Sequence, residues 1–231
     1  AASAAAIDAM LKISDMEKGS LLCDVGAGVA HLTIELSIRN LRVNAVEPNH
    51  AMRSLGQERT KHLQNIEWSE GVGEATEQPD DLFNMVTFGS SFNVCDPALA
   101  LNETARILKP NGWFACLYNN RQLDDPIQAQ IEVLIKEMLP DYKYGTRREN
   151  HSQIIDASNL FHTVIQLSSS IVHEQRVEDC VEAWKSHATL ARQAGPKFEE
   201  IISKIEEYLI SLECEAINVP YQTNVWLAQL K

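Results

Sequence analysis

Short, uninterrupted apolar runs alternate along the first half of the chain with longer stretches in which apolar residues recur every three or four positions. Apolar runs of this length are typical of parallel strands covered on both faces, and the three-to-four spacing predicts helices that bury one side. The alternation indicates βαβ units and a parallel sheet that binds its ligand at the carboxyl ends of the strands. The predicted strands are residues 21–25, 41–46, 66–68, 83–88 and 113–118, and the predicted helices are residues 3–17, 30–39, 51–63 and 98–108.

The pattern changes after residue 118. The elements predicted there are a helix at 126–139, a polar segment at 141–150, a strand at 163–174, helices at 177–192 and 196–213, and a strand at 221–230. This is more helical sequence than a connection between two strands of one sheet requires. We therefore interpret residues 119–150 and 177–213 as cap segments over the ligand site, and residues 163–174 and 221–230 as the last strands of the sheet.

Composition narrows the possible partners. The chain has 231 residues, 45% of them hydrophobic, which fits one α/β domain with an added cap as well as it fits two small domains. Its formal net charge of −12 argues against nucleic acid or an anionic membrane as the partner, because both require clustered Lys and Arg. No apolar run approaches the ~20 residues of a membrane span, and we do not expect the Ala-rich start to be a signal peptide, because it lacks a basic region. The five cysteines form no CxxC pair, so we expect free thiols, a cytoplasmic location and no metal.

The most specific feature is the segment Asp24-Val25-Gly26-Ala27-Gly28, between a predicted strand and a predicted helix. Gly26 supplies the backbone freedom that a tight turn after the strand requires, and Gly28 lets the backbone approach a ligand closely. The free N–H groups that start the next helix attract a carboxylate or phosphate. A carboxylate at position 24 is unfavourable beside a phosphate and suits a ligand with a cationic amine.

An acidic residue ends the second predicted strand. Glu47 lies 21 residues after Gly26, and an acid at this spacing and strand end accepts hydrogen bonds from ribose hydroxyls. The dinucleotide pattern GxGxxG fits only in part, because His31 occupies its third glycine position. The two features together predict a ligand that contains ribose, and they disfavour a nicotinamide oxidoreductase.

At these residues the sequence resembles the class I S-adenosylmethionine-dependent methyltransferases. A weaker similarity, in residues 117–121 and 219–223, is to a small-molecule subgroup that includes trans-aconitate-methyltransferase-like enzymes. The resemblance implies a Rossmann-like three-layer αβα sandwich with a seven-stranded, mostly parallel sheet, an antiparallel last strand and helical cap insertions. Residues 1–231 would then be one methyltransferase domain, a monomer or homodimer, with residues 1–118 as its cofactor-binding core. The segments that carry the resemblance, in order, are residues 24–28, 47–49, 71–75, 82–87 and 106–112.

The resemblance implies S-adenosylmethionine as cofactor and S-adenosylhomocysteine as product. Asp24, Gly26 and Gly28 would surround the methionine part, Glu47 would hold the ribose, and Met52 would cover the adenine. Relatives often have Asp at the position of Val72, so adenine recognition here would depend on the N–H of Gly73 or on Glu74. The full set of expected cofactor residues is Asp24, Gly26, Ala27, Gly28, Glu47, Pro48, Asn49, Met52, Val72, Gly73, Glu74, Gly89 and Ser90.

The acceptor side is less specified. Asn93 stands where relatives often have His, which removes an evident general base and favours a nucleophile that is already ionised, such as a carboxylate. Arg121, with Arg147 and Arg148 as similar candidates, would orient an anionic substrate through paired hydrogen bonds, although an exposed loop cation is the simpler interpretation. Trp184 is either a wall of the substrate pocket or core packing. The expected acceptor residues are Asn93, Tyr118, Asn119, Arg121, Arg147, Trp184 and Tyr221.

The sequence thus predicts an enzyme that transfers the sulfonium methyl group by SN2 displacement to a small organic acceptor, at a carboxylate or hydroxyl oxygen. Such a displacement requires alignment of the nucleophile, the methyl carbon and the sulfur more than acid–base groups. Two alternatives remain: methylation of a protein or RNA, against which the acidic charge weighs for RNA, and a module that binds the cofactor without turnover.

Overall fold

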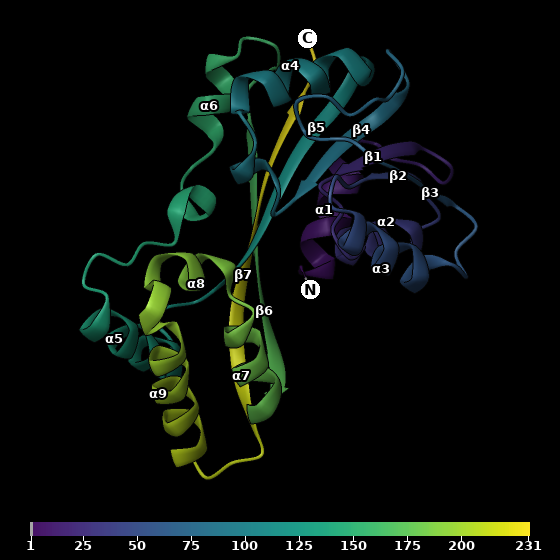
Figure 1. Cartoon of the computed structure of the whole chain (residues 1–231). Coiled ribbons are helices and arrows are strands. Elements are labelled where there is room, and N and C mark those ends of the chain that lie inside the picture. The colour runs from purple at the N-terminus through teal and green to yellow at the C-terminus, as the bar shows by residue number, and fades with distance from the viewer. Residues whose placement is uncertain (1) are drawn as a thin grey trace. The chain divides into compact units, whose positions relative to one another are not determined.

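The computed structural model in Figure 1 describes residues 2–231, and for Ala188 it describes the backbone alone. Its elements are, in order, α1 (Ala4–Ile13), β1 (Leu21–Val25), α2 (His31–Ser37), β2 (Arg42–Val46), α3 (His50–Thr60), β3 (Ile66–Ser69), β4 (Phe83–Gly89), η1 (Phe92–Val94), α4 (Pro97–Ile107), β5 (Leu108–Arg121), α5 (Pro126–Met138), η2 (Gly145–Arg148), α6 (Ser152–Ala157), β6 (Ile165–Arg176), α7 (Val177–Lys185), α8 (Ala188–Ala194), η3 (Gly195–Lys197), α9 (Phe198–Ser211) and β7 (Ala216–Gln229).

The strands form one seven-stranded sheet in the order β3-β2-β1-β4-β5-β7-β6. β1 pairs in parallel with both β2 and β4, and β4 pairs in parallel with β5. The last strands are antiparallel, so the predicted Rossmann-like fold class is confirmed. The chain order reverses between β1 and β4, and sheets of this kind bind ligands beyond the carboxyl ends of the strands at such a reversal.

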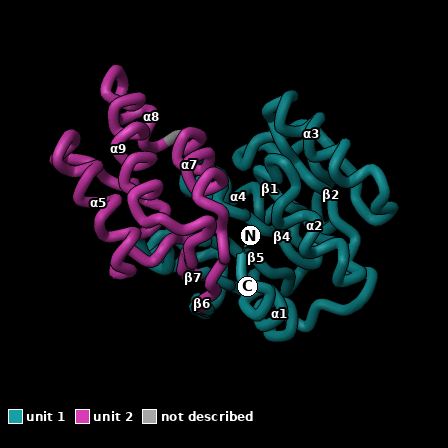
Figure 2. The backbone as a smooth tube through the Cα atoms, turned by 90° about the horizontal axis from the view of Figure 1, so that it is seen from below, with its two compact units in different colours: residues 1–119, 149–169, 223–231 teal, residues 120–148, 170–222 magenta. Residues whose placement is uncertain are grey.

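The chain divides into two compact units, which Figure 2 shows in different colours. β5, β6 and β7 each begin in one unit and end in the other. Unit 1 comprises residues 1–119, 149–169 and 223–231, and unit 2 comprises residues 120–148 and 170–222.

Unit 1 packs helices on both faces of its part of the sheet, because successive strand residues point to opposite faces. Leu22 and Met85 belong to an apolar cluster with residues of α1 and α2. Their chain neighbours Cys23 and Val86 belong to a second cluster, with residues of α4 and α6. The strand–turn–helix connections at the carboxyl ends of β1, β2 and β4 are therefore fixed by a packed core on either side.

Unit 2 has an apolar core of its own, formed by α5, α7, α8 and α9 with the adjoining strand segments. Ile135 of α5, Val181 of α7 and Leu209 of α9 are all buried there. Residues 177–192 were expected to form one helix, but α7 ends at Lys185 and α8 follows it. The break occurs because the side chain of His187 accepts the N–H of Leu190 at 3.2 Å and so begins a new helix.

The structure also differs from the sequence prediction in the bounds of several elements. β7 begins at Ala216, not at residue 221, and α1 and α3 end at Ile13 and Thr60, before the expected residues 17 and 63. β5 begins at Leu108, not at residue 113, and it includes the expected turn at residues 110–112: Asn111 has φ 62°, and the pairing with β4 shifts register there. A residue other than glycine in the left-handed region, together with a register shift in the pairing, marks an irregularity within the strand and not its end. α6 was not predicted, because six residues are too few for a helical period to be recognised.

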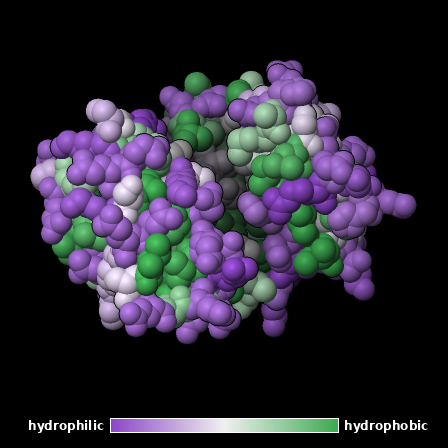
Figure 3. Space-filling model, turned by 60° about the horizontal axis from the view of Figure 1, so that its bottom comes forward, coloured by the Kyte–Doolittle hydropathy of each residue, from purple (hydrophilic) through white to green (hydrophobic). Residues whose placement is uncertain are grey.

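Hydrophilic side chains cover most of the face shown in Figure 3, and apolar ones occur there in separate patches. Among residues 2–231, no helix combines the length and the apolar character that a bilayer crossing requires.

Candidate active site

The glycine turn after β1 is held by the end of β2. The backbone N–H groups of Gly26 and Ala27 donate to the carbonyl oxygen of Val46 at 2.8 and 3.1 Å. Gly26 and Gly28 have φ values of 68° and 57°, in the left-handed region that L side chains rarely adopt. The turn therefore depends on glycine at both positions, as the sequence predicts.

Gly26 also makes room for the segment that follows β4. A Cβ atom at position 26 would lie 2.4 Å from the Cβ of Ser91. The Ser91 hydroxyl donates to the carbonyl oxygen of Val25 at 2.5 Å, which locks the two segments together. Nothing in the sequence relates Ser91 to the glycine turn, since the two are 65 residues apart.

Glu47 links the glycine turn to the start of α3. Its Oε2 accepts the N–H of Gly28 and its Oε1 accepts the N–H of Asn49, both at 2.8 Å. The residue is 5% exposed, and each carboxylate oxygen keeps a further lone pair. The Asn49 side chain in turn accepts the N–H of Met52 and begins α3. A buried, pre-oriented carboxylate with unused acceptor capacity fits a ribose diol, as expected for the predicted cofactor.

Met52 lies over the second glycine of the turn. Its terminal methyl is 3.3 Å from where a Cβ on Gly28 would be, and the side chain is 43% exposed. An exposed, flexible thioether beside bare backbone suits a covering role over a flat ring. The exposed position of Met52 is compatible with the expected contact between its side chain and the adenine.

Asp24 lies below the turn, fully buried between α2 and β4. Its Oδ2 accepts the hydroxyl of Thr33 at 2.6 Å, and its Oδ1 accepts the hydroxyl of Thr87 at 3.0 Å. Burial raises the pKa of Asp24 to about 6, and the two threonine hydrogen bonds oppose the rise. The carboxyl group thus changes charge close to neutral pH, where a cationic amine nearby would favour its ionised form.

We expect the stability of the cofactor-free protein to depend on pH through Asp24. A carboxyl whose pKa is raised on folding stabilises the protein at low pH, and this contribution is lost as the pH rises through about 6. Relative to Asp24→Asn, the free energy of unfolding of the wild type should fall by about 3 kcal/mol between pH 4 and pH 8. Urea titrations of both proteins across this range measure the difference, and parallel curves would contradict the assignment.

The segment expected to pass the adenine edge forms a tight turn. Val72 and Ala75 exchange backbone hydrogen bonds at 3.0 and 3.1 Å, and Val72 is 43% exposed. A Cβ on Gly73 would lie 2.5 Å from the sulfur of Cys95, so this turn packs against the segment after β4. The Oε1 of Glu74 accepts the N–H of Asp96 at 2.6 Å, which ties Glu74 to the start of α4.

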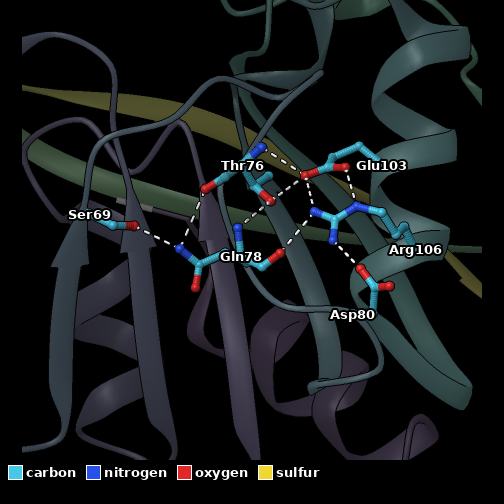
Figure 4. Close-up of polar contacts among 6 residues, drawn as sticks. All are labelled: Ser69, Thr76, Gln78, Asp80, Glu103 and Arg106. Carbon is cyan, nitrogen blue, oxygen red and sulfur yellow. Dashed lines mark hydrogen bonds and ion pairs between the residues drawn. The ribbon is translucent and has the colours of Figure 1, made fainter.

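A polar network anchors the loop that follows this turn (Figure 4). Glu103 of α4 accepts both the N–H and the hydroxyl of Thr76, and it pairs with Arg106 at 2.7 Å. Arg106 also donates to the carbonyl of Gln78 at 2.9 Å and pairs with Asp80. Burial would raise the pKa of Glu103, but these hydrogen bonds outweigh it and lower the pKa to about 2. The anchor keeps the Val72–Glu74 turn beside the end of β4.

A cavity of about 230 Å³ lies in unit 1 at the carboxyl ends of β4 and β5. It contains three residues expected in the site, namely Gly89, Ser90 and Asn119. Burial lowers the pKa of His31, which keeps this imidazole neutral at the wall of the cavity. The lining residues are Ala2, Ile7, His31, Leu32, Glu35, Gly89, Ser90, Leu117 and Asn119.

The acceptor residues expected in unit 1 lie around the same strand ends. The Oδ1 of Asn93 is buried and has no hydrogen-bond partner among the residues that the structure describes. Asn119 accepts the hydroxyl of Thr223 at 2.8 Å. Tyr118 is fully buried and stacks on His151, with ring centroids 4.9 Å apart.

Sequence reasoning missed His151. It is 2% exposed and packed against the rings of Phe92, Tyr118 and Trp226, with centroid distances of 5.9, 4.9 and 4.9 Å. Its position at the end of a polar segment gave no signal of burial. Its pKa is lowered, mainly by burial, so the ring is neutral at pH 7.

Three of the four acceptor residues expected in unit 2, namely Arg121, Trp184 and Tyr221, lie together there. The guanidinium of Arg121 lies 4.4 Å from the centre of the Trp184 ring and 5.9 Å from that of Tyr221. Trp184 is 2% exposed and belongs to the apolar core of the unit, so it is both core packing and the support of an arginine. Arg147 lies in η2.

No group of three or more His, Cys, Asp or Glu side chains suited to a metal occurs within residues 2–231. The five cysteines are free thiols, and Cys214 is the exposed one.

Comparison with known proteins identifies relatives of this fold and site. The model of the ubiE/COQ5 methyltransferase family matches residues 7–146. A demethylmenaquinone methyltransferase of Staphylococcus carnosus is 30% identical over 135 residues, which are 57% of this chain and 56% of that protein. The chain therefore spans about half the length of the curated relatives that it matches.

Two solved structures share the fold. The YcgJ protein of Bacillus subtilis superposes with a TM-score of 0.60 at 16% identity, over 99% of both chains. Phosphoethanolamine N-methyltransferase 2 of Haemonchus contortus, solved in complex with S-adenosyl-L-methionine, superposes with a TM-score of 0.55 at 16% identity, over 96% of this chain and 51% of that one.

Proposed function

Because the chain belongs to the ubiE/COQ5 methyltransferase family, we propose that its methyl acceptor is a small organic molecule, methylated at a carboxylate or hydroxyl oxygen. The chain is a class I S-adenosylmethionine-dependent methyltransferase, with S-adenosylmethionine as cofactor. The small-molecule, trans-aconitate-methyltransferase-like character of the acceptor side belongs to the proposal.

The cofactor residues follow from the turn geometry. Glu47 would accept the ribose hydroxyls, Asp24 would face the charge of the methionine amine, and Met52 would cover the adenine. Gly89 and Ser90 line the cavity at the end of β4, next to the glycine turn that Ser91 clasps. The bound cofactor supplies an electrophilic methyl group on a sulfonium. The protein has to align an acceptor oxygen with it and exclude water.

The observation that carries the acceptor proposal is the absence of a base at the expected position. Asn93 supplies an amide where an imidazole would abstract a proton, and its Oδ1 is buried and unpartnered in the described part of the chain. An amide orients a hydroxyl or carboxylic acid through hydrogen bonds without taking its proton. An acceptor that is already ionised, such as a carboxylate, requires no base, and Arg121 in unit 2 has the charge to bind it.

A ring carbon of a quinol is the second candidate acceptor, because the relatives are named demethylmenaquinone methyltransferases. The family match ends at residue 146, so it does not include Trp184 or Tyr221, two of the expected acceptor residues. The similarity therefore supports the cofactor half of the reaction more strongly than the identity of the acceptor.

A labelled-methyl screen distinguishes the two candidates. Purified protein is incubated with methyl-labelled cofactor and separate panels of carboxylic acids, hydroxylated metabolites and hydroquinones, and products are identified by mass spectrometry. We expect methyl esters or ethers from the first two panels. Label found only on ring carbons of hydroquinones would overturn the oxygen acceptor and favour the second candidate.

A further inference from the structure

Unit 2 contains an unusual gathering of arginines. Arg121 is stacked on Trp184, as described above, and Arg148 lies with its guanidinium 4.3 Å from the centre of the Tyr144 ring. The Nη2 of Arg148 donates to the backbone carbonyl of Arg121 at 3.0 Å, so the two residues lie side by side. Stacking on an aromatic face fixes the plane of a guanidinium, and its N–H donors lie in that plane.

The charges of three arginines converge on the same buried groups. Arg121, Arg147 and Arg148 all contribute, after burial, to lowering the pKa of His187 to about 4. The same three arginines oppose the rise that burial causes in the pKa of Tyr142. His187 is therefore neutral at pH 7 and adds no charge of its own; it stacks on Trp184 with ring centroids 5.1 Å apart.

Among the residues that the structure describes, the carboxylates near the cluster are not paired with Arg121 or Arg148. Glu132 is the carboxylate beside the cluster: it accepts the hydroxyl of Tyr144 and lies 3.8 Å from Lys136. Within residues 2–231, no Asp or Glu forms an ion pair with Arg121 or Arg148. Arg121 and Arg148 thus have no carboxylate ion-pair partner among residues 2–231, in a chain whose net charge is −12.

A buried hydroxyl in the cluster also lacks a partner. Tyr142 is 6% exposed, and its OH makes no hydrogen bond to any residue that the structure describes. Leaving a buried hydroxyl unsatisfied is unfavourable, and such atoms often mark the place of a missing ligand. The ring of Tyr142 packs against that of Tyr144, with centroids 5.2 Å apart, and Tyr144 in turn supports the Arg148 guanidinium. Tyr142 therefore lies close to the arginine cluster, whose charges oppose the rise in its pKa.

We propose that Arg121, Arg148 and Tyr142 bind an oxyanion, a carboxylate or phosphate group of the methyl acceptor. A guanidinium donates two parallel hydrogen bonds to such a group, and the tyrosine hydroxyl donates a third. The inference depends on the proposed function in one respect, namely that the anion belongs to the acceptor. It makes the acceptor an anionic molecule, which the neutral ring of a quinol is not.

Calorimetric titration of the full chain tests anion binding without turnover. Succinate, citrate and inorganic phosphate are titrated separately at low ionic strength, because salt screens such contacts. We expect at least one of them to bind with a Kd of roughly 1 mM or tighter. Binding of the carboxylates alone assigns a carboxylate acceptor, and binding of phosphate alone assigns a phosphorylated one. If none of the three binds, the proposal is wrong.

Variants locate the site. Arg121→Gln should weaken binding of the responding anion about 10- to 100-fold, and Arg121→Lys should weaken it less, since the charge remains while the planar fork is lost. Tyr142→Phe removes an unpartnered hydroxyl, so it should weaken binding several-fold without lowering the thermal midpoint. The control is Arg176→Gln, which changes an exposed arginine of the same unit that pairs with Glu178 at 3.3 Å. Equal losses in Arg121→Gln and Arg176→Gln would overturn the proposal.

The outcomes separate this inference from the proposed function. S-adenosylhomocysteine should bind all of the variants as it binds the wild type, because every expected cofactor residue belongs to unit 1 and none of the variants changes one of them. If anion binding depends on Arg121 but methylation occurs on ring carbons, the proposed oxygen acceptor is wrong and the anion site stands. If uncharged hydroxyl compounds are methylated and no anion binds, the anion site is wrong and the proposed oxygen acceptor stands.

Discussion

Replacing Gly26 with alanine is expected to lower the free energy of unfolding by about 3 kcal/mol and to weaken S-adenosylhomocysteine binding about 100-fold. Two costs add at this position. The φ of 68° is unfavourable for any residue with a Cβ, and that atom would lie 2.4 Å from the Cβ of Ser91. Ser91 cannot move away without losing its 2.5 Å hydrogen bond to Val25. Urea titration and calorimetry measure the two losses.

Gly19 provides the matched control. Its φ is 84°, but a Cβ there meets nothing within 4 Å. Gly19→Ala should therefore show only the conformational cost, about 1 kcal/mol, with cofactor affinity unchanged. If the two alanine variants lost equal stability and both bound S-adenosylhomocysteine like the wild type, the close approach of Ser91 would have no role in the site.

Glu47→Gln is expected to weaken S-adenosylhomocysteine binding roughly 100-fold. The amide that replaces Oε1 or Oε2 is a donor, and it would face a backbone N–H, either that of Gly28 or that of Asn49. The side chain would then have to turn, and it would lose the charge that strengthens hydrogen bonds from ribose hydroxyls. Isothermal calorimetry of the variant measures the affinity directly.

The same substitution at Glu70 is the comparison. Glu70 is 72% exposed, directly follows β3 and pairs with Arg53 at 2.7 Å. Glu70→Gln removes an equal charge close to the same sheet edge, so it controls for long-range electrostatics. Unchanged affinity in Glu47→Gln, or an equal loss in Glu70→Gln, would count against ribose binding by Glu47.

The strands and the cofactor turn could be predicted because their signals are local. The run at residues 21–25 is continuous and apolar since both faces of β1 are covered, and its bounds agree with the structure. Glu47 could be identified from its distance to Gly26 along the chain. Contacts between distant residues could not be predicted from the pattern. Ser91 donates a hydrogen bond to Val25, which lies 66 residues away, and hydrophobic periodicity contains no information on such a contact.

The acceptor side shows the same limit more clearly. Arg121 and Trp184 are 63 residues apart, and the sequence indicated each as an acceptor residue without indicating that the two are in contact. Their stacking depends on how α7 packs in unit 2. His151 was missed because its burial comes from Phe92, Tyr118 and Trp226, which lie far from it in the chain. Local polarity is a poor guide where distant rings enclose a residue.

The discontinuity of both units has a consequence for synthesis at the ribosome. Unit 1 includes residues 223–231, which are translated after every residue of unit 2. Trp226 and Ala228 complete the apolar cluster on one sheet face, and Val225 and Leu227 complete the other. The nascent first 119 residues therefore expose apolar surface on both faces until the last strand emerges, and exposed surface of this kind makes a folding intermediate prone to aggregation. All residues of unit 2 are translated once residue 222 has been added, so unit 2 can fold before unit 1 is complete.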